Sequence, residues 1–233
     1  MSKRILFIVV DSVENKINEE TKVSITPNLG KEDAYVFIKT PDNISELYYN
    51  LKDEANKIIN DVNNFDYICL INNGSTLNEN AKKMFADYQL DREDGIKEIY
   101  LPFVFTMVDD RAVILNKHIW TNVADTPGIL DIDLATKQVD STIFGAFIPT
   151  EFFFNPSFYD NDLKYYQQYK LLNHLADGNS IVLGIPKITL TVRNWDYKLE
   201  NLEKEEKLKY FNQARSEWDR SKKKIKIPEP VQV

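Results

Sequence analysis

The stretch of sequence that decides the fold is Phe65-Asp66-Tyr67-Ile68-Cys69-Leu70-Ile71-Asn72-Asn73-Gly74-Ser75-Thr76-Leu77. A run of mostly branched apolar side chains ends here at a cluster of Asn, Gly and Ser, which predicts a buried strand followed by a tight turn. Asn78 then predicts the N-cap of a helix through Ala81, Met84 and Phe85. Because ligands of open α/β sheets bind beyond the carboxyl ends of the strands, the loop after this strand is the expected place for a site.

The segments before it predict an alternation of strands and helices. Residues 5–10 and 34–38 are predicted strands, with a polar interval from Val13 to Asp33 between them. Residues 44–62 carry apolar side chains at helical spacing, and Asn43 with Glu46 forms a capping-box signature. This alternation favours a mostly parallel sheet with helices on its faces.

The pattern after Gly95 is richer in short strands. Residues 99–107 and 112–115 are predicted strands joined by a turn at Asp109-Asp110-Arg111, and 142–149 is a further buried run. A helix over 163–175 ends near Gly178, and we expect two more strands over 181–186 and 188–192. An aromatic segment occupies 152–160.

The last part of the chain differs in composition. Residues 197–220 carry an apolar stripe among many Lys and Glu, which predicts an amphipathic helix lying on another surface. The Lys-rich residues that follow cannot bury enough apolar surface to fold alone. The sequence therefore predicts a domain over 1–196, an amphipathic helix over 197–221 and an extended basic arm over 222–233. The arm is either a solvated tail or a segment that docks on a neighbouring subunit or an acidic surface.

Bulk composition excludes several classes of protein. A chain of 233 residues with 43% apolar content is long enough for one sizeable core, and its net charge of -7 disfavours nonspecific nucleic-acid binding. Cys69 is the only cysteine, so no intrachain disulfide can form, and its place in the central apolar run predicts core packing. The apolar run near the N-terminus is too short to span a membrane and lacks a cleavage site, so we expect neither a signal peptide nor a membrane partner.

Three stretches together resemble the GT-A fold of the family-2 glycosyltransferases, most closely its short phage-borne relatives, over about residues 4–192. Residues 67–81 are similar to the strand and loop in which such enzymes place an Asp-x-Asp metal motif. Residues 144–152 with 158–160 are similar to their acceptor-side segment. Residues 165–172, with Gly178 and Ile185-Pro186 after them, are similar to the helix that carries the base and to the strand that follows.

The resemblance implies chemistry for which the matching residues are neutral. An inverting sugar transfer needs a divalent ion on hard oxygen ligands and a carboxylate that takes the acceptor proton. The family's metal motif falls on Asn72 and Asn73, its base on Gln167 or Gln168, and its histidine on Val192. A second alignment matches residues 72–76 to the family's uridine-binding Asp-Asp-Gly-Ser loop, and it restores no carboxylate either.

Other acidic residues leave an alternative open. Asp131 and Asp133 form a literal Asp-x-Asp, although an N-cap and first-turn acid is the usual explanation for that pattern, and Asp140 could line a cleft. Asp11 and Asp42 follow the first two predicted strands and, with Asn73, are the residues that the resemblance implies for nucleotide contact. His118 and His174 lack a partner motif and are expected to be structural.

These residues predict a catalytically degenerate glycosyltransferase-like domain, without a metal or other cofactor, that serves as a structural or binding component. The resemblance implies a component of a phage virion or similar assembly, located in the virion or in the host cytoplasm, with protein partners contacted through residues 197–233 or with further copies of itself. The alternative is an active nucleotide-sugar-dependent glycosyltransferase that uses Asp131, Asp133 or Asp140, with Mn²⁺ or Mg²⁺ or without metal. A sugar- or nucleotide-binding module without chemistry is a third interpretation.

Overall fold

A computed structural model of the chain describes residues 3–11, 16–39, 44–89, 97–108, 111–115, 143–155 and 180–192, together with Glu205, Glu206 and Lys209. The strands are β1 (Ile5–Asp11), β2 (Ala34–Lys39), β3 (Tyr67–Asn72), β4 (Thr76–Leu77), β5 (Lys97–Val108), β6 (Arg111–Leu115), β7 (Phe147–Pro149) and β8 (Ser180–Val192). The helices are α1 (Glu19–Ile25), η1 (Thr26–Asn28), α2 (Ile44–Ile58), η2 (Val62–Asn64), α3 (Ala81–Asp87) and α6 (Thr150–Phe153).

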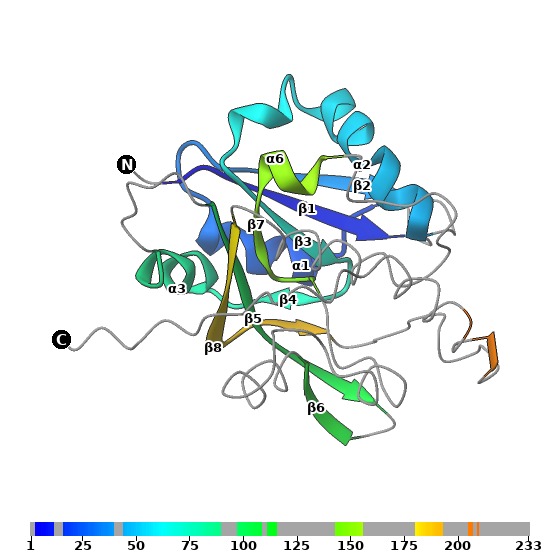
Figure 1. Cartoon of the computed structure of the whole chain (residues 1–233), viewed down its shortest axis with the longest axis vertical. Coiled ribbons are helices and arrows are strands. Elements are labelled where there is room, and N and C mark those ends of the chain that lie inside the picture. Colours follow the sequence, from blue (N-terminus) through cyan, green and yellow to red (C-terminus); the bar gives the residue numbers. More distant parts are fainter. Residues whose placement is uncertain are drawn as a thin grey trace.

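The strands form one mixed sheet, in which eight strands are described. Its order is β2-β1-β3-β7-β5-β8-β4, and β6 pairs with β5 as a hairpin that extends away from the rest of the sheet (Figure 1). Strands β2, β1 and β3 are parallel to one another, and β5 is parallel to β8. The fold is therefore α/β with two parallel groups of strands, and the predicted α/β class is confirmed.

Strand β7 joins these two groups. It runs antiparallel to both neighbours, and Phe147 is paired with Cys69 of β3 on one side and with Tyr100 of β5 on the other. All three residues of β7 are buried. The parallel strands β1 and β3 are nearly continuous apolar runs, as expected for strands that are covered on both faces.

Helix α3 contributes the centre of the core through Phe85. Its ring is stacked on that of Phe147 at 4.5 Å and meets the edges of Tyr67 and Tyr100 at 4.9 and 4.8 Å. One side chain of α3 thus contacts β3, β7 and β5, and aromatic pairs of this geometry add about 0.5–1.5 kcal/mol each beyond their buried area.

Gly145 sets the entry into β7. Its φ of +75° lies in the left-handed region, and a Cβ at this position would come within 2.9 Å of Cβ of Leu190. Its N–H donates to the carbonyl of Leu70 at 2.8 Å. Only glycine combines this backbone conformation with so close an approach to β8.

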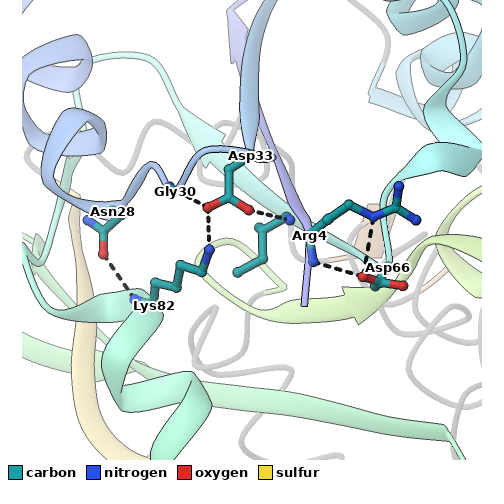
Figure 2. A network of polar contacts seen from close by, with 7 residues as sticks. Arg4, Asn28, Gly30, Asp33, Asp66 and Lys82 are labelled. Atoms are coloured by element: carbon teal, nitrogen blue, oxygen red, sulfur yellow. Dashed lines mark hydrogen bonds and ion pairs between the residues drawn. The ribbon is translucent and has the colours of Figure 1, made fainter. Parts of the chain in front are cut away.

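A buried ion pair lies near the amino ends of β1 and β3 (Figure 2). The Asp33 carboxylate, whose side chain is 1% exposed, pairs with Lys82 of α3 and accepts hydrogen bonds from the N–H groups of Ile5 and Gly30. Nearby, Asp66 accepts a hydrogen bond from the Arg4 N–H at 2.8 Å. A buried charge is tolerated when it is paired and hydrogen-bonded in this way, so these contacts fix the loop before β2 and the start of α3.

Most strand predictions are confirmed within about two residues, but three predictions are wrong. The interval 13–33 contains α1 and η1, since Asn18 accepts a hydrogen bond from the Glu20 N–H and the helix buries Thr21 and Ile25. Residues 181–186 and 188–192 form one strand, because a bulge in its pairing with β5 absorbs the irregularity. The predicted N-cap of the helix after β4 was Asn78, but the N-cap of α3 is Asn80 and the helix begins at Ala81.

Two further elements differ from their predicted bounds. Helix α2 ends at Ile58 instead of continuing to residue 62, where η2 begins. In the buried run predicted over 142–149, only the last three of the described residues 143–149 are strand. The capping residue Asn43, the predicted helix 163–175 and most of the predicted helix 197–220 lie outside the described residues.

Burial raises the pKa of two core side chains. It raises the pKa of the Cys69 thiol far above its usual value of 9.0, and burial followed by the charges of Glu98, Asp66 and Glu151 raises the pKa of Tyr67 far above 10.0. Above about pH 9 the unfolded chain loses these protons while the folded chain keeps them. The free energy of unfolding is therefore expected to fall as the pH rises further.

The Tyr67→Phe and Cys69→Ala variants should each flatten this alkaline loss, because each removes one group that ionises only on unfolding. The measurement is urea unfolding at a series of pH values between about 7 and 11. Slopes with pH are compared, since either substitution also changes packing. A double variant with the wild-type slope would show that other groups cause the loss.

Candidate functional site

The candidate site is the loop at the carboxyl ends of β1 and β3. Val10 and Asn72 are paired in register, so Asp11 at the end of β1 and Asn73 after β3 emerge side by side. The Asn73 N–H donates to the carbonyl of Val10 at 2.9 Å. The predicted strand followed by a polar turn is confirmed, although the short strand β4 lies between this turn and α3.

The side chain of Asn73 makes three hydrogen bonds within the protein. Its amide nitrogen donates to Oδ2 of Asp11 at 2.7 Å and to the carbonyl of Lys16 at 3.2 Å. Its Oδ1 accepts the backbone N–H of Asn18, the residue that caps α1, at 2.7 Å. Asn73 therefore holds the end of β1 and the start of α1 on the end of β3.

This pattern of bonds requires an amide at position 73. An ionised carboxylate accepts hydrogen bonds but donates none, so an aspartate here would face the Asp11 carboxylate at the distance now bridged by the amide N–H. Two carboxylates that close together cannot both ionise without a cost in stability. Position 73 is where the resemblance expects a metal-binding carboxylate. The groups around it, above all the Asp11 carboxylate, favour a neutral side chain that can donate a hydrogen bond.

Gly74 and α1 complete the loop. Gly74 has a φ of +83° in a turn closed by a hydrogen bond from the Ser75 N–H to the carbonyl of Asn72. Oγ1 of Thr21, on α1, accepts the Gly74 N–H at 2.9 Å and donates to the carbonyl of Ser75 at 2.8 Å. Because Thr21 is completely buried, α1 is locked against the turn.

The structure brings together only some of the predicted site residues. Asp11 and Asn73 are in contact, and Asn72 lies beside them at the end of β3. Val192 is buried at the end of β8, and strands β7 and β5 lie between β8 and β3 in the sheet. The other predicted site residues lie outside the described part of the chain: Asp42, Asp131, Asp133, Asp140, Gln167 and Gln168.

The sequence prediction missed the contribution of α1. Lys16, Asn18 and Thr21 all contact the loop after β3, yet they fall in the segment that was predicted to be a polar interval. Asn18 followed by two glutamates is a helix-start signal that could have revealed the helix. Nothing in the local sequence indicates that Thr21 hydrogen-bonds a residue 53 positions later.

The described part of the chain contains no cluster of three His, Cys, Asp or Glu side chains arranged to hold a metal ion. Among its helices none is long and apolar enough to cross a bilayer.

Cys69 lies within β3, where burial raises its pKa, so its thiol stays protonated and is not a nucleophile.

Neither a protein-family model nor a curated protein matches this sequence.

We expect the Asn73→Asp variant to lower the free energy of unfolding at pH 7 by about 2–4 kcal/mol, because it replaces a donated hydrogen bond with repulsion from Asp11. Urea unfolding measures the change. The loss should shrink near about pH 4, where one of the two carboxyl groups carries a proton and donates to the other.

Two variants serve as controls for this prediction. Asn73→Ala removes the same hydrogen bonds without adding charge, so its loss should not depend on pH in this way. Asn72→Asp places the same charge one residue earlier and should cost less. If Asn73→Asp is as stable as the wild type at pH 7, the amide is not required.

Proposed function

We propose that this chain is a GT-A-like domain that lacks the catalytic carboxylates and serves as a structural or binding component of an assembly of the phage virion type. The observation that carries the proposal is the set of hydrogen bonds made by the Asn73 side chain to Asp11, Lys16 and Asn18. An amide whose nitrogen and oxygen are both used in this way supports the fold and brings no charge for a metal ion.

The order and direction of the strands are compatible with the proposed GT-A-like fold. Three parallel strands, β2-β1-β3, are followed by the antiparallel strand β7 and a second parallel pair, and the polar loop lies at the carboxyl ends of β1 and β3. Ligands of open α/β sheets bind at such an edge. The GT-A identity and the phage context come from the resemblance described above, and both belong to the proposal.

The hairpin of β5 and β6 adds support for a role in protein contacts. Phe105 is paired with Ile114 and Met107 with Ala112, so these four apolar side chains share one face of the hairpin. Met107 is 42% exposed and Ile114 is 36% exposed. Grouped apolar side chains on a surface are more typical of contact with another protein than single ones are.

The alternative is an active glycosyltransferase that uses Asp131, Asp133 or Asp140. A panel of UDP-, GDP- and TDP-sugars with Mn²⁺ separates the two functions. We expect neither hydrolysis nor transfer, whereas turnover that is abolished by Asp133→Asn would establish the alternative. Calorimetry with the same panel tests the third interpretation, because binding without turnover indicates a sugar- or nucleotide-binding module.

The C-terminal arm provides a second test. If the C-terminal arm is the attachment segment and the partner is another copy, the full chain should show a larger solution mass by light scattering than a chain that ends at Arg220. A full-length variant with Gln in place of Lys222, Lys223 and Lys224 separates the effect of charge from that of length. Equal monomeric masses for all three proteins over a wide concentration range would exclude self-assembly through the arm.

A further inference from the structure

Asn73 and Gly74 form the only Asn–Gly pair in the chain. This pair has a characteristic spontaneous chemistry. The backbone nitrogen of the glycine, after losing its proton, attacks Cγ of the asparagine, a five-membered succinimide forms, and ammonia leaves. Water then opens the ring to give aspartate or isoaspartate. Glycine favours the reaction because no side chain hinders the approach of its nitrogen.

Both reacting groups are held by hydrogen bonds in the folded protein. The attacking nitrogen belongs to the Gly74 N–H, which donates to Oγ1 of Thr21 at 2.9 Å. The carboxamide under attack is held by Asp11, Lys16 and Asn18. The reaction needs the N–H to release its proton and the carboxamide to turn toward it, and these four bonds oppose both changes.

Burial does not provide this protection. Asn73 and Gly74 are only partly buried, and a Cβ placed on Gly74 would meet nothing within 4 Å. Water and hydroxide can therefore reach the outer side of the turn. On its buried side the turn contacts α1, where the completely buried Thr21 hydroxyl donates to the carbonyl of Ser75.

We propose that Asn73 is a deamidation site that α1 keeps closed, and that its modification is a one-way change of the loop. The succinimide forms only when α1 releases the turn, and hydrolysis leaves a carboxylate next to Asp11. That product cannot donate to Asp11 and repels it, so the modified loop does not close again in the same way. This proposal does not depend on the function proposed above.

The test is the rate of deamidation at Asn73, followed by peptide mass spectrometry of the full chain at 37 °C and about pH 8. We expect the folded protein to react at least about tenfold more slowly than the same protein in urea, because only the open fraction reacts. Thr21→Val, which removes the acceptor of the Gly74 N–H, should accelerate the reaction of the folded protein several-fold.

Ser24→Ala is the matched control. Ser24 lies one turn further along α1, and its hydroxyl accepts the Leu77 N–H at 3.0 Å and donates to the Thr21 carbonyl at 2.7 Å, whereas the Gly74 N–H is bonded to Thr21. It should accelerate deamidation only as far as it lowers the global stability, which is measured by urea unfolding. Thr21→Ser keeps a hydroxyl and should restore a rate close to that of the wild type.

Two results would overturn the proposal. One is a wild-type rate that is the same in the folded protein and in urea, since the hydrogen bonds would then give no protection. The other is a Thr21→Val variant whose faster deamidation is fully explained by its lower global stability, which is the result expected of the control Ser24→Ala. If Thr21→Val does not fold, the comparison of folded and unfolded wild type still decides.

Discussion

The pairing of β7 with strands on both sides is the contact on which the rest of the described structure depends. The three-residue strand β7 lies between one parallel group, β2-β1-β3, and a second parallel pair, β5-β8. Its residue Phe147 is in register with one residue of each group. Phe85 of α3 then covers this seam through its contacts with Phe147, Tyr67 and Tyr100. Strand β7 runs antiparallel to both of its neighbours, whereas the strands within each group are parallel and need long crossover connections.

This arrangement sends the carboxyl ends of β1 and β3 to one edge, and the polar residues there serve the fold. In many α/β proteins such an edge presents charged groups to a ligand. Here the Asn73 amide bridges the Asp11 carboxylate, the Lys16 carbonyl and the Asn18 N–H, and Thr21 holds the following glycine. The charged network of Asp33 and Lys82 lies near the amino ends of β1 and β3, where it fixes α3 and the loop before β2.

The same amide connects the proposed function with the proposed modification. A neutral residue at position 73 weakens any metal site at this loop, and it also permits the hydrogen bond that keeps Asp11 satisfied. Its chemical weakness comes from the neighbouring glycine, which the turn needs because of its positive φ. The loop thus combines a residue pair that is prone to deamidation with a helix that restrains it.

The sequence by itself determined the α/β class, the buried strand that ends at Asn72, the strands at β1, β2, β5 and β6, and the core position of Cys69, because long apolar runs have few other places to go. It also identified Asn72 and Asn73 as neutral residues at the loop. Only the tertiary structure decided the orientation of β7, the continuity of β8 and the extent of α1, whose start signal at Asn18 is followed by a helix of only seven residues. It alone paired Asn73 with Asp11 and Thr21 with Gly74, since hydrogen bonds between residues more than 50 positions apart depend on the folded chain.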